Sequence, residues 1–168
     1  KRFWNMIYYA FGQKRVVSKP FGINHFVLFW AFMVLLISNT EFLLNGLFPS
    51  LSFSNLPNGA YFTLVYIFDI MSVLALLSVI LATIRRLTFP PPYTEAKSRD
   101  AFTILGMVAV LMLAYFGLRA SDIVAGTETA AAYMPISNFV ANHILYGLGA
   151  PETAARVFWW IHAIVLLS

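Results

Sequence analysis

Three long apolar runs constrain what this 168-residue chain can fold into. They cover residues 23–48, 60–84 and 101–118, and a fourth apolar run begins near Thr153. A helix needs about 20 apolar residues to cross a membrane. The chain is 60% hydrophobic and only 11% charged, whereas soluble domains carry about 25% charged residues. The sequence therefore predicts an all-α fold, a transmembrane helix bundle with four spans.

The fourth run reaches Ser168 after about 15 residues, so we expect a truncated span and a domain that continues in a longer polypeptide. Residues 1–22 are basic and aromatic, which is typical of a segment that lies at the membrane interface. The sequence thus predicts two parts, a cytoplasmic interfacial segment in residues 1–22 and a transmembrane domain in residues 23–168, whose candidate cofactor ligands are considered below.

The distribution of lysine and arginine predicts the orientation of the spans. There are five of these residues in 1–22 and four in 85–100, against none in 49–59 and two in 119–156. Because cytoplasmic loops carry an excess of Lys and Arg, the N-terminus and the 85–100 loop are expected in the cytoplasm. We expect a multi-pass protein of a bacterial or archaeal cytoplasmic membrane.

The chain contains no cysteine, which excludes disulfides and any iron–sulfur cluster held by its own thiolates. No glycine-rich phosphate loop occurs, and no basic patch stands apart from the membrane flanks. We therefore expect lipid and membrane-soluble molecules as partners, and no nucleic acid.

Two of the three histidines lie within apolar runs. His25 is at the head of the first run, and His162 is about nine residues into the fourth. Ionisable residues inside membrane spans are costly and mark functional sites, and imidazole is a common ligand of metals and haem iron. Their predicted depths differ by roughly 14 Å, so they are expected in two separate sites, one near each face. The alternative is that each only hydrogen-bonds a neighbouring helix.

The third histidine, His143, lies in the long outer connection. Residues 136–148 are predicted to form a short amphipathic helix that turns His143 towards the bundle, as a partner of His162. A histidine that meets lipid headgroups is the alternative. The predicted apolar face consists of Ile136, Phe139, Val140, Ile144 and Gly147.

Four charged residues accompany the histidines. Asp69 lies at the predicted depth of His162, where it could orient a ligand histidine or take protons from a quinol; the alternative is a polar contact between helices. Arg85 and Arg86 mark the inner membrane edge and could neutralise haem propionates. Glu41 is expected at the outer interface.

Four blocks carry a resemblance to a known family: Tyr9-Ala-Phe-Gly-Gln-Lys-Arg-Val16, Lys19-Pro-Phe-Gly-Ile-Asn-His-Phe-Val-Leu-Phe-Trp-Ala-Phe32, Ser98-Arg-Asp-Ala101 and Trp159-Trp-Ile-His162. They resemble the membrane domain that precedes the iron–sulfur part of heterodisulfide-reductase-related oxidoreductases. That domain is similar to the gamma subunit of respiratory nitrate reductase, a b-type cytochrome.

The resemblance implies one or two b haems, with His25 and His162 as ligands and His143 as a substitute ligand. It also implies electron exchange between menaquinone or another quinone and a cytoplasmic iron–sulfur module, on the same chain or a subunit. Relatives include proteins that pass electrons from electron-transfer flavoprotein to quinone. Diheme relatives carry a second histidine where this chain has Leu35 and Leu36, so a single-haem version stays open.

Two other functions remain as alternatives to the membrane part of a quinone-linked oxidoreductase. One is a non-redox membrane anchor or assembly subunit. The other is a small proton-coupled transporter with a proton path through His25, Asp69 and His162; such a transporter should show interrupted helices in paired halves.

Overall fold

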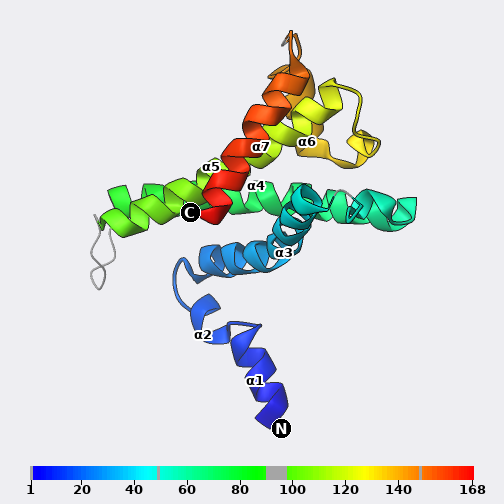
Figure 1. Cartoon of the computed structure of the whole chain (residues 1–168). Helices are drawn as coiled ribbons and strands as arrows, with labels where there is room; N and C mark the ends of the chain where they lie inside the picture. Colours follow the sequence, from blue (N-terminus) through cyan, green and yellow to red (C-terminus); the bar gives the residue numbers. More distant parts are fainter. Residues whose placement is uncertain (1, 49, 90–97, 148) are drawn as a thin grey trace.

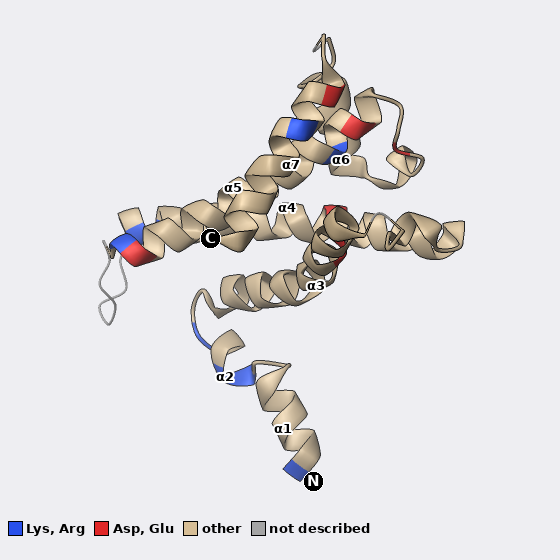
Figure 2. Ribbon diagram, in the orientation of Figure 1, with Lys and Arg blue, Asp and Glu red and all other residues tan. Residues whose placement is uncertain are grey.

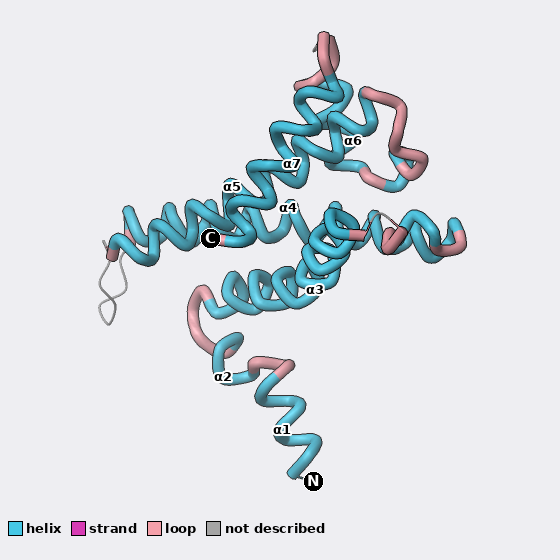
Figure 3. Tube along the Cα trace, in the orientation of Figure 1, coloured by secondary structure: helices cyan, strands magenta, loops and turns pink. Residues whose placement is uncertain are grey.

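The computed structural model describes residues 2–48, 50–89, 98–147 and 149–168, and in these ranges every regular element is a helix (Figure 1, Figure 3). The predicted all-α class is confirmed. Residues 90–97, half of the predicted 85–100 loop, lie outside the described residues. The elements are α1 (Arg2–Ala10), α2 (Lys14–Val17), α3 (Gly22–Leu47), η1 (Phe53–Asn55), α4 (Asn58–Thr88), α5 (Arg99–Val124), η2 (Ala131–Tyr133), α6 (Pro135–His143) and α7 (Pro151–Leu167).

Three helices, α3, α4 and α5, are long and apolar enough to cross a membrane, with 26, 31 and 26 residues. They match the three complete apolar runs, although α5 continues to Val124 instead of ending near residue 118. The fourth run forms α7, whose 17 residues extend about 26 Å at 1.5 Å per residue. Figure 2 shows that Lys and Arg lie mainly towards the ends of the long helices, as expected for membrane spans.

The helices pack in sequential pairs, α3 on α4 and α4 on α5, while α7 lies along α5 (Figure 1). At Gly117 the ring of Phe158 from α7 packs so closely on α5 that an added Cβ would lie 2.5 Å from it. Small residues permit such close helix contacts in membranes. The buried core between α3, α4 and α5 consists of Ala31, Leu35, Phe68, Ala75, Met112, Tyr115 and Phe116.

The N-terminal helix α1 projects away from the other helices (Figure 1). None of its residues is buried, and Trp4 is 71% exposed. The ammonium of Lys14 lies 5.1 Å from the ring centre of Tyr8. Exposed aromatic rings beside cationic groups are typical of membrane interfaces, and the interfacial role of residues 1–22 stays a prediction.

The orientation of α6 is determined by Asp69, a fully buried residue in the middle of α4. Its carboxylate accepts hydrogen bonds from the backbone N–H of Ile136, at 2.7 Å, and from the N–H and hydroxyl of Ser137. These N–H groups are in the first turn of α6, where they have no partner within the helix. The carboxylate therefore caps α6 and turns Ser137 towards α4.

The predicted helix in the outer connection is present, but the predicted direction of His143 is wrong. The face fixed by Asp69 buries Ser137 and Ala141, which leaves Phe139 and His143 on the exposed side. The rings of Phe139 and His143 stack there at 4.4 Å. The helix ends at His143, and Leu148 of the predicted range lies outside the described residues.

Candidate functional site

A groove of about 490 Å³ lies between the start of α3 and the end of α4, and it contains three of the predicted site residues. His25 comes from the first turn of α3, while Arg85 and Arg86 come from the last turns of α4. The rest of its lining is mainly apolar and consists of Phe21, Asn24, Leu28, Leu81, Ala82, Ile84, Thr88 and Phe89.

Two contacts join the helices at this groove. The side-chain amide of Asn24 donates a hydrogen bond of 3.0 Å to the carbonyl of Ser78, which ties the start of α3 to α4. The guanidinium of Arg85 lies 4.2 Å from the ring centre of Phe21, a cation–π geometry. His25 is exposed in the groove. The groove thus offers an accessible imidazole, two cationic groups and an apolar wall.

His162 lies far from this groove, at a contact between α7 and α3. Its side chain is 3% exposed, and its Nε2 lies 3.3 Å from the Oδ1 of Asn39. The ring of Phe42 is 4.5 Å away, and the buried Nδ1 has no hydrogen-bond partner in the described part of the chain. Asn39 is 14 residues after His25 in α3, or about 21 Å along the helix. The two histidines therefore lie in separate places.

The other two predicted residues are not brought to His162. Within the described ranges, the hydrogen bonds of Asp69 all go to Ile136 and Ser137. This is the polar contact between helices that the sequence left as an alternative. His143 is exposed on α6, where its Nδ1 lies 3.0 Å from the carbonyl oxygen of Phe139.

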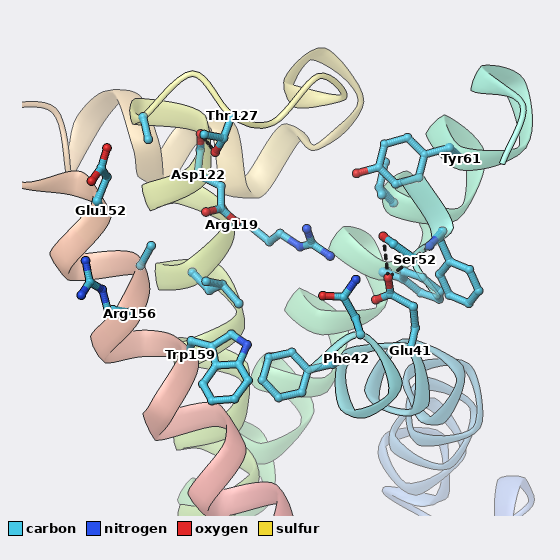
Figure 4. Close-up of a pocket in the computed structure, with 17 residues that line it drawn as sticks. Glu41, Phe42, Ser52, Tyr61, Arg119, Asp122, Thr127, Glu152, Arg156 and Trp159 are labelled. Atoms are coloured by element: carbon cyan, nitrogen blue, oxygen red, sulfur yellow. Dashed lines mark hydrogen bonds between the residues drawn. The ribbon is translucent and has the colours of Figure 1, made fainter. Parts of the chain in front are cut away.

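A second pocket, which the sequence did not indicate as a site, lies between α3, α4, α5 and α7 and has a volume of about 440 Å³ (Figure 4). We call it the outer pocket, because the charge pattern of the sequence predicts that this end of the helices lies outside. Its charged residues are Glu41, Arg119, Asp122, Glu152 and Arg156, and its aromatic walls include Phe42, Tyr61 and Trp159.

One wall of the outer pocket is fixed by Glu128, whose side chain is 5% exposed. The carboxylate accepts a hydrogen bond of 2.9 Å from the hydroxyl of Tyr61 and another of 2.9 Å from the backbone N–H of Ala130. It also pairs with the guanidinium of Arg119 at 3.3 Å. Glu41 also lines the pocket, where its carboxylate accepts hydrogen bonds of 3.1 Å from the hydroxyl of Ser52 and from the N–H of Phe53 (Figure 4).

His162 lies next to the outer pocket without lining it. Phe42 and Trp159 stand between them, since both rings belong to the pocket wall and Phe42 also contacts the imidazole. In the described residues, no three His, Cys, Asp or Glu side chains are close enough to hold a metal ion together.

In its described residues the chain is thus a helical protein, three of whose helices could cross a membrane. One groove holds an accessible histidine beside two arginines, and a separate pocket is lined by charged residues. Over 96% of its length it is 29% identical to an EtfAB:quinone oxidoreductase from Syntrophomonas wolfei. Over 95% of its length it is 28% identical to a "Probable iron-sulfur-binding oxidoreductase FadF" from Bacillus subtilis.

The matched segments make up 24% and 22% of these two proteins, so the chain spans about a quarter of the length of the curated relatives it matches. No family model matches the chain. No solved structure matches it significantly. The first relative is thus named as a quinone oxidoreductase and the second as a probable iron–sulfur-binding oxidoreductase.

Proposed function

We propose that this chain is the membrane domain of a quinone-linked oxidoreductase, and that it passes electrons between a cytoplasmic iron–sulfur module and a membrane quinone. The observation that carries the proposal is the match of 96% of the chain to an EtfAB:quinone oxidoreductase. The absence of cysteine from the sequence means that a cluster held by thiolates belongs to a partner module, on the same polypeptide or another subunit. Electron-transfer flavoprotein is the proposed soluble donor, because the relative from Syntrophomonas wolfei is named as an EtfAB:quinone oxidoreductase.

The second part of the proposal is a b haem in the groove that contains His25, Arg85 and Arg86. The residues of the groove fit this group: His25 is accessible and would ligate the iron, and Arg85 and Arg86 lie in the same groove of about 490 Å³. Arginine pairs well with carboxylates such as haem propionates. Phe21 and Leu28 provide apolar surface that keeps water from the ring.

The residues around His162 do not fit a haem. The ring of Phe42 lies 4.5 Å from the imidazole, and Asn39 lies 3.3 Å from its Nε2. These two side chains would have to move before iron could bind at Nε2. We therefore propose one haem, at His25, and assign His162 to the wall behind the outer pocket.

Each group then has a distinct task. A bound haem supplies one-electron transfer, while the protein supplies its ligand, orientation and surroundings. His25 would hold the iron, and Arg85 and Arg86 would bind the anionic edge of the haem, while the hydrogen bond from Asn24 to Ser78 fixes the start of α3 against α4.

The transporter alternative expects interrupted helices, whereas α3, α4 and α5 are each continuous. The anchor alternative makes a direct prediction, because a non-redox anchor binds no haem. The haem measurement below therefore separates it from the proposed function.

The test is the haem content of the native protein carrying His25→Ala, measured from the pyridine haemochrome spectrum. We expect loss of most of the haem. His143→Ala is the matched control, since this histidine is exposed and lies outside the groove, and it should keep the full content. His25→Met adds an independent check, because methionine ligates haem iron but raises the reduction potential. Wild-type haem content and potential in both His25 variants would overturn the assignment.

A further inference from the structure

Two cavities of different character share one wall at the outer end of α3. The outer pocket is lined by charged and aromatic residues, as described above. Next to it lies a groove of about 590 Å³, in which the accessible surface of the lining residues is almost wholly apolar. Glu41, Ser52 and Phe53 line both cavities. We call the second cavity the apolar groove; its other residues are Leu36, Ile37, Thr40, Leu44, Ser50, Leu51, Asn55 and Leu56.

The apolar groove faces outward from the helices. Leu36, Ile37 and Leu51 are 48%, 52% and 52% exposed. On a membrane-spanning helix such as α3, exposed leucine and isoleucine side chains meet lipid. The groove is therefore reached from the bilayer, while the outer pocket is reached past Glu152, whose side chain is exposed to solvent.

Glu41 is held at the boundary between the two cavities. Two hydrogen bonds of 3.1 Å, from the hydroxyl of Ser52 and the N–H of Phe53, fix its Oε1. From the opposite wall, Figure 4 shows the Arg119 side chain extending into the outer pocket towards Glu41. A carboxylate and a guanidinium thus approach the pocket from two sides.

This arrangement matches a molecule with a small polar ring and a long hydrocarbon tail. Both volumes are within the range of about 300–1,000 Å³ that is typical of ligand pockets. We propose that the outer pocket binds the head group of an isoprenoid quinone, that the apolar groove binds its tail, and that Glu41 exchanges protons with a quinone oxygen. The proposal rests on the proposed function, and it assigns that function a site and a proton carrier.

The reaction balances with the partners already named. Reduction of a quinone to a quinol takes two electrons and two protons, and the electrons come from the iron–sulfur module of the proposed function. Glu41 in its acid form donates a proton to one quinone oxygen, becomes a carboxylate and takes up a proton from solvent at the Glu152 end of the pocket. The second proton reaches the other oxygen, on the opposite side of the ring, from solvent in the open part of the outer pocket, and oxidation of quinol reverses each step.

The first experiment replaces Glu41 by glutamine in the native protein and measures turnover with a short-tailed menaquinone. Loss of a positioned proton carrier costs about 10²–10⁴-fold in rate, so we expect kcat to fall at least 100-fold. The dependence of kcat on pH should flatten, which a purely structural residue would not cause. Asp100→Asn is the matched control, because Asp100 is an exposed acid in the first turn of α5 and should retain full activity.

The second experiment fills the apolar groove with Leu51→Trp. KM should rise about tenfold for a quinone with a prenyl tail and stay unchanged for the same ring without a tail. Equal effects on both substrates, or none, would overturn the assignment of the groove. Wild-type turnover and pH dependence in Glu41→Gln would overturn the role of Glu41.

Quinone binding separates this proposal from the proposed function. Titration calorimetry with the short-tailed menaquinone can be carried out on His25→Ala, where no haem is needed. Binding that is lost in Leu51→Trp and kept in His25→Ala supports the site even if haem binds elsewhere. Haem at His25 with quinone binding that is indifferent to Leu51→Trp would overturn the site and leave the proposed function standing.

Discussion

The contact between α5 and α7 makes a sharp prediction, because it depends on one missing side chain. A Cβ added at Gly117 would lie 2.5 Å from two ring carbons of Phe158 and 2.6 Å from the Cγ. Ordinary contacts between carbon atoms are about 3.5–4.0 Å. The ring cannot clear the new methyl group by moving its far edge alone, since the Cγ at its base is also too close.

Gly117→Ala should therefore destabilise the protein. Overpacking of a well-packed contact costs about 1–3 kcal/mol, while replacing glycine by alanine in a helix gains up to about 1 kcal/mol. The net loss is expected at about 0–3 kcal/mol, and it can be measured by reversible unfolding in mixed micelles with increasing denaturing detergent.

Gly106→Ala is the matched control on the same helix, since nothing lies within 4 Å of the added Cβ. It should gain stability, so the two variants should differ by about 1–3 kcal/mol. Adding Phe158→Leu to Gly117→Ala should recover part of the loss. Equal stability of the two alanine variants would show that α5 and α7 do not approach as closely as described.

Two further predictions concern α6 and α1. Asp69→Ala should leave the N–H groups of Ile136 and Ser137 unpaired, at a cost of about 1–3 kcal/mol, and hydrogen exchange in the first turn of α6 should become faster. The control is Asn142→Ala, an exposed change on the same helix that should have no effect. Equal exchange rates in the two variants would argue against the cap. If α1 lies at the membrane interface, bromine-labelled lipids should quench the fluorescence of Trp4 most strongly when the labels are near the headgroups. The Trp4 signal is measured as the wild-type fluorescence minus that of Trp4→Phe. Quenching only by labels at the bilayer centre would contradict the interfacial position of α1.

The helices were predictable because apolar length alone determines a membrane span. The predicted starts of the first three spans lie within two residues of α3, α4 and α5. The end of α5 was missed because Arg119 and Asp122 suggested a loop, although charged residues do not stop a helix. The face of α6 was missed because the buried carboxylate of Asp69, 67 residues before Ile136, overrides the apolar pattern of the short helix.

The groove at His25 was predictable from the sequence, whereas the outer pocket was not. His25, Arg85 and Arg86 were predicted together because each marks the same end of neighbouring spans, so depth along the helices is enough to unite them. The outer pocket depends on contacts that no local pattern contains, such as the bond from Tyr61 to Glu128 across 67 residues. The available signal is an arginine and two acids after the third apolar run, Arg119, Asp122 and Glu128, although charges at this place are equally typical of a loop.

The central claim is that this domain carries electrons between a bound haem and a membrane quinone. Its most direct test is a reduced-minus-oxidised absorption spectrum of the purified native protein, followed by addition of oxidised menaquinone under anaerobic conditions. The account predicts a b-type band that disappears when the quinone is added, and that is absent in His25→Ala. A protein without any haem band, or with a band that menaquinone leaves unchanged, would contradict the account.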